Sequence, residues 1–159
     1  MALDMRRVLV AGLVSSVVMG MVSMMGEALL GAGFWAAPTL IAATVMRDLQ
    51  TLHAPVPLMV LPLMLGLMGH MMNSVVLTGI FEAATGGRLV GFFERALVGM
   101  VFGMIVFGAM WFVVLPFVNP VMLLLNPVVF AVAHLLWGAA LGMLLSTPAG
   151  QPARRLAAH

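Results

Sequence analysis

The chain has 159 residues, of which 64 % are hydrophobic and 8 % are charged. Soluble domains carry about 25 % charged residues, so this chain cannot cover itself with a water-compatible surface. Cysteine is absent, which excludes disulfides, thiolate metal sites and cysteine nucleophiles. The formal net charge of +2 comes from scattered arginines without a basic cluster, so nucleic acid is not an expected partner.

Four apolar stretches have about the length that crosses a ~30 Å hydrocarbon core. They predict a single all-α domain, a four-helix transmembrane bundle in contact with the lipid bilayer. The expected spans are residues 8–30, 56–81, 96–115 and 121–145. A chain of this length is expected to hold no second globular domain.

The arginines set the expected orientation, because cytoplasmic loops of membrane proteins are enriched in basic residues. Arg47 is the one arginine in the first and third connections. The other six precede the first span, separate the second from the third, or follow the fourth: Arg6, Arg7, Arg88, Arg95, Arg154 and Arg155. This distribution predicts a multi-pass protein of the bacterial inner membrane with both termini in the cytoplasm.

The first outer connection is predicted to contain one interfacial helix, at residues 39–51. Ile41, Val45 and Leu49 recur there at helical spacing, with Arg47 and Gln50 on the opposite side. The alternative is a first or second span that is longer and contains a break.

The second outer connection contains the pairs Asn119-Pro120 and Asn126-Pro127 and carries no charge. It is predicted to be a turn at the membrane interface. Proline is favoured in the first turn of a helix, so the fourth helix is expected to begin at one of these two prolines.

The sequence also suggests a parallel duplication of two helical hairpins. The stretch R-V-L-V-A from Arg7 matches R-A-L-V-G from Arg95, and the second and fourth spans align around His70 and His134. Two hairpins of this kind would be parallel repeats. Chance matching of apolar sequence is the other interpretation.

His70 and His134 are the main candidates for a ligand site, because an ionisable residue at membrane depth is costly. Both lie on helices that run in the same direction, at similar distances from their starts. Two facing imidazoles can hold a b-type haem, so the pair predicts haem or metal ligation. The alternative is that each histidine only donates a hydrogen bond to a neighbouring helix or to a partner subunit.

Methionine is frequent, with 17 residues, and recurs every fourth position at Met64, Met68 and Met72. That spacing stacks thioethers on one helix face, and thioether sulfur selects Cu(I). Met68 and Met72 are therefore candidate copper ligands for binding or transport. The alternative is that methionine replaces leucine in ordinary packing.

Glu27 is the only acid inside a predicted span. Its position near the outer end of the first span predicts an outer-side polar cluster with Arg47 and His53. Other interpretations are a carboxylate at the headgroup level and a proton or quinone site shared with His70.

Small residues recur every fourth position at Gly12-Ser16-Gly20, Gly99-Gly103 and Gly138-Gly142, which predicts close helix packing inside the bundle or against a partner. No motif for hydrolysis, phosphate binding or dinucleotide binding is present. We therefore expect an accessory or assembly subunit of a larger bacterial membrane complex, with a respiratory complex as one setting, rather than a free-standing enzyme.

The last span reads A-H-L-L-W-G from Ala133 and continues through L-G at Leu141 and Gly142. It resembles the A-H-L-x-x-G-x-x-L-G ending of small uncharacterised prokaryotic membrane proteins, and the stretch G-F-W-A-A-P from Gly33 adds to the likeness. The resemblance implies a four-helix fold and no known activity.

Overall fold

The computed structural model describes residues 4–86 and 91–146, which form helices and the turns between them. Four helical stretches are long and apolar enough to cross a membrane, which suggests a lipid environment. In chain order the elements are α1 (Met5–Leu30), α2 (Ala36–Ala42), η1 (Arg47–Thr51), α3 (Val60–Thr85), α4 (Phe92–Ala109), η2 (Met110–Val114), α5 (Leu115–Val118), η3 (Pro120–Leu124) and α6 (Pro127–Leu144). The prediction of four such helices is thus confirmed, with boundaries that differ by several residues.

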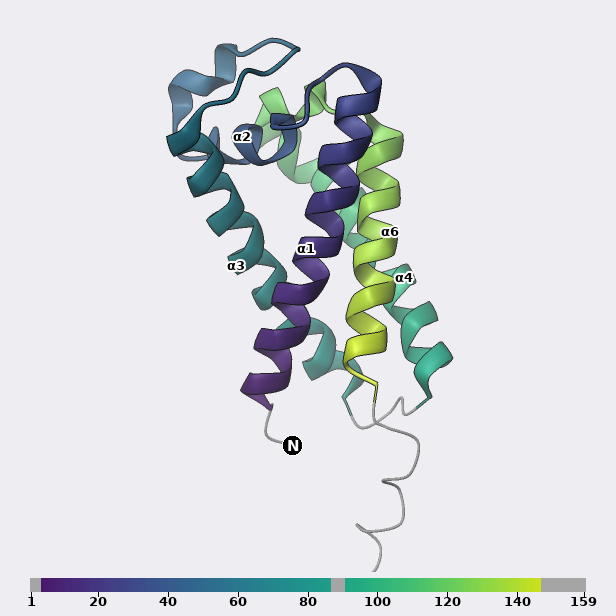
Figure 1. Ribbon diagram of the computed structural model, residues 1–159. Coiled ribbons are helices and arrows are strands. Elements are labelled where there is room, and N and C mark those ends of the chain that lie inside the picture. Colours follow the sequence, from purple (N-terminus) through teal and green to yellow (C-terminus); the bar gives the residue numbers. More distant parts are fainter. Residues whose placement is uncertain (1–3, 87–90, 147–159) are drawn as a thin grey trace, which may run out of the picture.

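Helix α1 is the centre of the arrangement (Figure 1). It packs against α3 on one side and against α6 on the other, and α6 packs in turn against α4. Helices α3 and α6 run in the same direction, opposite to α1 and α4. This direction agrees with two parallel hairpins, although the duplication itself stays a prediction.

The start of α1 and the end of α6 meet at one end of the bundle, here called the N/C end. Arg7 donates a hydrogen bond of 2.6 Å from Nη2 to the carbonyl oxygen of Leu145, and Arg95 at the start of α4 donates to the same oxygen. Arg47 lies at the opposite end, here called the loop end, where its Nη1 donates to the carbonyl oxygen of Val118 at 2.6 Å. The predicted separation of Arg47 therefore holds for the described arginines; Arg88, Arg154 and Arg155 lie outside the described residues.

Helices α4 and α6 are in direct backbone contact because glycines face each other. A Cβ atom on Gly99 would overlap the carbonyl oxygen of Gly138, and one on Gly138 would overlap that of Gly99. Gly103 and Gly142 are equally crowded, by the carbonyl oxygens of His134 and Arg95. The small-residue stripes are thus used inside the bundle.

The third long helix continues from α4 through a π-helical turn, η2, into α5, so it covers residues 92–118. Proline lacks the backbone N–H group that a regular α-helix needs and its ring crowds the preceding turn. Pro116 lies two residues after the π-helical turn ends at Val114, as expected for a local widening that relieves this crowding. The predicted end at residue 115 was therefore too early.

The helix expected at residues 39–51 is shorter, begins earlier and is buried, so the prediction of one interfacial helix is corrected. Helix α2 ends at Ala42 and η1 begins only at Arg47. Ala36, Leu40 and Ala43 have exposures of 0 %. Helix α2 packs closely on α3, where a Cβ on Gly66 would overlap the carbonyl oxygen of Pro38. Small side chains allow α2 to enter the bundle instead of lying on it.

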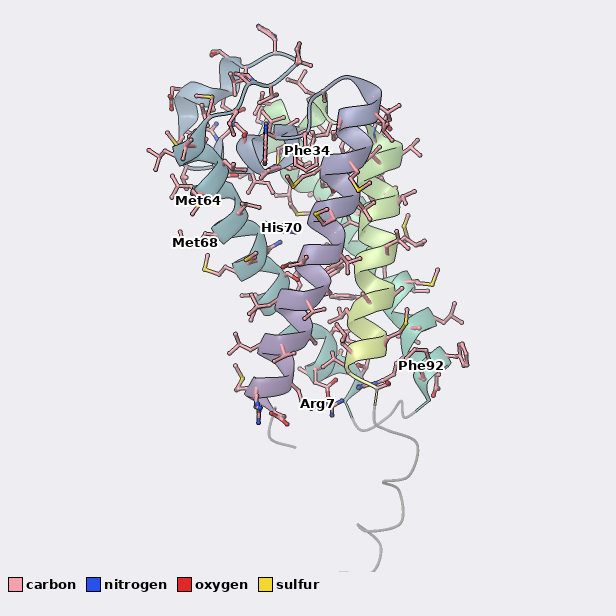
Figure 2. All side chains as sticks on the ribbon, in the orientation of Figure 1. Arg7, Phe34, Met64, Met68, His70 and Phe92 are labelled. Carbon is pink, nitrogen blue, oxygen red and sulfur yellow. The ribbon has the colours of Figure 1, made fainter. Side chains whose placement is uncertain are left out.

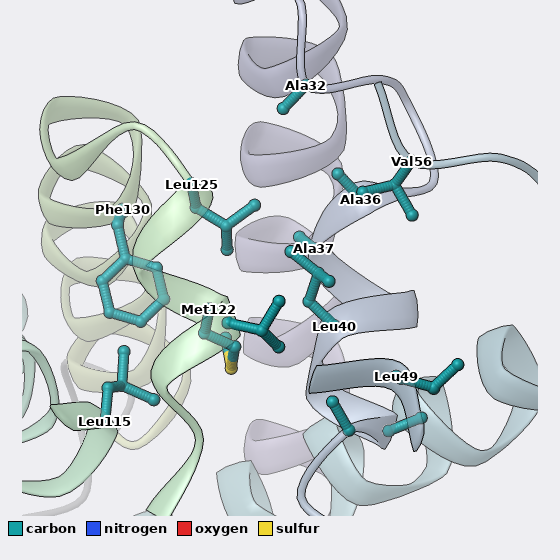
Figure 3. Packing of buried hydrophobic residues seen from close by; sticks show 13 residues of the cluster. Ala32, Ala36, Ala37, Leu40, Leu49, Val56, Leu115, Met122, Leu125 and Phe130 are labelled. Carbon is teal, nitrogen blue, oxygen red and sulfur yellow. The ribbon is translucent and has the colours of Figure 1, made fainter. Parts of the chain in front are cut away.

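The apolar cluster at the loop end joins α2 to the segment before α6 (Figure 3). Leu40 and Ala37 approach it from one side, and Met122, Leu125 and Phe130 from the other. The cluster closes this end of the bundle over the central helices.

Buried amides reinforce this closure. Asn119, with an exposure of 2 %, donates from Nδ2 to the carbonyl oxygen of Leu40 at 2.9 Å and to Thr44 Oγ1 at 3.0 Å. Gln50 donates to Asn119 Oδ1 at 2.6 Å and accepts from the backbone N–H of Val121. The two loop-end connections are therefore joined by hydrogen bonds of one buried amide, Asn119, and one half-buried amide, Gln50.

Helix α6 begins where one of the two predicted prolines lies. Pro127 occupies its first position, and the side chain of Asn126 accepts hydrogen bonds from the N–H groups of Val128 and Val129. An asparagine cap followed by proline is a strong helix start. Pro120 begins the short helix η3 instead.

Candidate functional site: the two central histidines

His70 is held against the backbone of α1. Its Nε2 lies 3.0 Å from the carbonyl oxygen of Ser16 and, as a carbonyl only accepts, donates its proton there. Nδ1 then carries the free lone pair. Figure 2 shows the imidazole directed towards α1.

His134 is buried between α6 and α4, with an exposure of 3 %. Its Nδ1 lies 2.8 Å from the carbonyl oxygen of Phe130, one turn earlier in the same helix. The rings of Phe130 and His134 are 4.4 Å apart between centroids. The two histidines therefore differ in bonding: His70 contacts a neighbouring helix, and His134 its own.

The histidines lie at the same level of the bundle, as the sequence predicts. Trp137, one turn after His134, donates from Nε1 to Ser74 Oγ at 2.8 Å. Ser74, one turn after His70, donates in turn to the carbonyl oxygen of Gly12 at 2.8 Å. These two bonds fix the relative depth of α6, α3 and α1.

A cavity of about 30 Å³ lies beside His70, and Phe130 closes it on the side of α6. His134, behind Phe130, is not part of its lining. Cofactor pockets have volumes of about 300–1,000 Å³, so this space does not admit a haem macrocycle. The two histidines lie at the same level, but only His70 lines this cavity. The pair therefore does not fit a b-type haem held between the two imidazoles.

Met68 and Met72 lie on the exposed face of α3, so they cannot ligate one metal ion together with His70. Their exposures are 61 % and 65 %. Two residues along a helix correspond to roughly 200° of rotation, and Figure 2 shows Met64 and Met68 directed away from the bundle. The fold therefore does not bring these methionines together with either histidine in one copper site.

Glu27 contacts the start of α6 rather than the other polar residues predicted beside it. Its exposure is 2 %, and Oε1 accepts a hydrogen bond of 2.9 Å from the backbone N–H of Asn126. A carboxylate at a helix N-terminus is stabilised by the unpaired N–H groups there. Arg47 bonds to Val118 instead, and His53 is exposed.

Sequence reasoning missed a partly buried ion pair at the N/C end. Arg95 Nη2 lies 2.8 Å from Glu82 Oε2, and the two side chains are 2 % and 17 % exposed. The pair joins the end of α3 to the start of α4. The sequence does show a charged residue beside each of two apolar stretches. That these two residues pair depends on the relative position of α3 and α4, which the sequence does not show.

Sequence reasoning also passed over Asn73, near the middle of α3. Its side chain is exposed, and no hydrogen bond joins it to any described residue. Away from their ends, the four long helices expose no other hydrogen-bonding polar side chain in the described part of the chain. An amide on an otherwise apolar surface is an available contact point for another molecule.

The described residues contain no group of three histidine, cysteine, aspartate or glutamate side chains that could hold a metal ion. Comparison with protein-family models, with curated proteins and with solved structures finds no match to this chain.

Proposed function

We propose that this chain is an accessory or assembly subunit of a larger bacterial membrane complex, and that it contacts a transmembrane helix of its partner through α3. The observation that supports this is the amide of Asn73, which lies at the centre of a long apolar helix and has no hydrogen-bond partner among the described residues. Helix α3 has 26 residues, about 39 Å at 1.5 Å per residue, so its centre falls at mid-membrane depth.

An amide in hydrocarbon is unfavourable because lipid tails offer no hydrogen-bond partner. A neighbouring helix with a polar side chain would satisfy it, and such bonds contribute about 0.6–2 kcal/mol to helix association. Asn73 thus gives a physical reason for a partner, whereas apolar exposure alone is satisfied by lipid.

The surface around Asn73 is suited to helix packing. Val76 and Ile80 follow it on the same side of α3, with exposures of 56 % and 53 %. We call these three residues the Asn73 face. It is flanked by Met72, whose flexible thioether adapts to different neighbours.

The glycine stripes do not compete as partner contacts, because they are engaged within the bundle. Gly99 and Gly103 pack on α6, and Gly12 packs on Val75 of α3. Association through this chain therefore depends on a polar contact rather than on close glycine packing.

The arginine distribution supports the orientation in this proposal. Arg6, Arg7 and Arg95 lie at the N/C end, which we place in the cytoplasm by the positive-inside rule. The setting we propose is the bacterial inner membrane, with the loop end outside.

The test is purification from native membranes in mild detergent, followed by comparison of Asn73→Leu with the unaltered chain. We expect the unaltered protein to elute with additional membrane proteins or copies, and Asn73→Leu to weaken that association about 3- to 30-fold. Asn73→Gln, which keeps the amide, should retain it. Met21→Leu is the matched control, on the exposed face of α1.

The Leu variant should still fold, because Asn73 has no hydrogen bond to the described residues. An isolated, monodisperse single chain for the unaltered protein, or equal association for Asn73→Leu, would contradict the proposal.

A further inference from the structure

The cavity beside His70 has a wall that carries several soft donor groups. Met19 and Met24 reach it from α1, and Met122 reaches it from η3. His70 and Ser23 complete the set of lining residues with nitrogen, oxygen or sulfur in their side chains. Residues of α1, α2, α3, η3 and α6 thus line one space next to the loop-end cluster.

The hydroxyl of Ser23 has no partner among the described residues, although the side chain is only 7 % exposed. Serines in helices usually donate to a carbonyl in the preceding turn. Ser15 and Ser16 do so here, at 2.7 and 2.8 Å. Ser23 is therefore a polar residue of the cavity lining whose hydroxyl has no hydrogen-bond partner among the described residues.

His70 has the bonding typical of a metal-ligating histidine. Such histidines commonly donate one ring N–H to a backbone carbonyl, which fixes the ring and leaves the other nitrogen for the metal. The Nε2 contact of 3.0 Å to the carbonyl oxygen of Ser16 supplies this, and Nδ1 remains.

The methionines at the cavity differ from those on the surface of α3. Met24 and Met122 are 8 % and 5 % exposed, whereas Met68 and Met72 are 61 % and 65 % exposed. Thioether sulfur favours Cu(I) over harder ions, and neutral imidazole also binds copper. The volume of about 30 Å³ suits a single ion or a water molecule.

A carboxyl group follows the cavity residues of α1, although it is not part of the cavity lining. Glu27 lies one turn after Ser23 and Met24 on α1 and is 2 % exposed. A buried carboxylate is costly unless an opposite charge or hydrogen bonds compensate it. Among the described residues, Glu27 accepts one hydrogen bond, from the backbone N–H of Asn126.

We propose that this cavity is a Cu(I) site whose ligands are the thioethers of Met19, Met24 and Met122 and the imidazole of His70. The proposal is independent of the Asn73 face. Its rival is a water molecule bonded to Ser23 and His70.

The test is titration of the purified full chain in detergent with Cu(I) against a competing chelator. We expect one Cu(I) per chain, with sulfur and nitrogen ligands in its X-ray absorption spectrum. Met24→Leu and Met122→Leu preserve volume and apolarity, so they should keep the fold while weakening Cu(I) binding by about tenfold or more. His70→Ala should remove the nitrogen signal.

Met68→Leu and Met72→Leu are the matched controls, because they remove thioethers from the exposed face of α3. They should leave Cu(I) affinity unchanged. Circular dichroism and elution volume establish that each variant is folded. No retained Cu(I), as expected for a cavity that holds only water, would overturn the proposal. Equal affinity in Met24→Leu, Met122→Leu and the controls would also overturn it.

Discussion

Individual buried polar residues set the positions of the helices relative to each other. Trp137 and Ser74 bond across α6 and α3, and Glu27 bonds to the backbone at the start of α6. In an apolar interior such groups have few alternatives, so each bond favours one register. These buried polar groups therefore favour one relative position for the helices that they join.

The Glu82–Arg95 pair gives a prediction at this scale. Glu82→Gln would leave the buried guanidinium of Arg95 without its counter-charge, and breaking such a pair costs about 3 kcal/mol. Unfolding of the purified protein by denaturing detergent should show this loss. Glu94→Gln, at an exposed position on α4 beside Arg95, should change stability by less than about 0.5 kcal/mol. Equal stability of the two variants would mean that the pair contributes little.

At the scale of elements, the four long helices were predictable because length and apolarity alone define them. The start of α6 was predicted only as one of two prolines, Pro120 or Pro127, and the helix begins at the second, where Asn126 caps it. Helix α2 was not predictable, because its burial depends on packing against α3 and α1, which no local sequence pattern indicates. The spacing of Ile41, Val45 and Leu49 is helical, yet Val45 is 71 % exposed and follows the end of α2.

The contact between α4 and α6 gives a prediction at the element scale. Gly138→Ala would place a Cβ against the carbonyl oxygen of Gly99, so the helices must separate. Overpacking of this kind costs about 1–3 kcal/mol, measurable by the same unfolding titration. Gly108→Ala is the matched control, because no atom lies within 4 Å of its added Cβ. Helix propensity should leave that variant equally stable or up to about 1 kcal/mol more stable. A Gly138→Ala variant as stable as Gly108→Ala would show that the interface is loose.

At the scale of the whole molecule, the sequence predicted which residues lie at the same depth in the bundle. It did not predict which residues line the same cavity. His70 and His134 lie at one depth, as their similar distances from helix starts indicate, but Phe130 separates His134 from the cavity. The methionines at the cavity could not be told from those on the surface, because 17 of them occur and the rotation of each helix was unknown. Asn73 was overlooked for the same reason: only the fold shows that it faces outward.

The orientation of the whole molecule can be tested with single cysteines, since the natural chain has none. His53→Cys, at the loop end, should react with a membrane-impermeant maleimide applied to intact cells. Ser146→Cys, at the N/C end, should react only after the membrane is opened. The reverse pattern would show that the chain has the opposite orientation.

The most direct test of the proposed subunit role is photo-crosslinking in intact membranes. A photoreactive amino acid at Val76 should form a discrete protein adduct, because the Asn73 face contacts a partner helix. The same group at Val17, exposed on α1, should react only with lipid. The adduct from residue 76 should be lost when Asn73→Leu is added and retained with Asn73→Gln. Only lipid products at both positions, or an adduct indifferent to Asn73, would contradict the account.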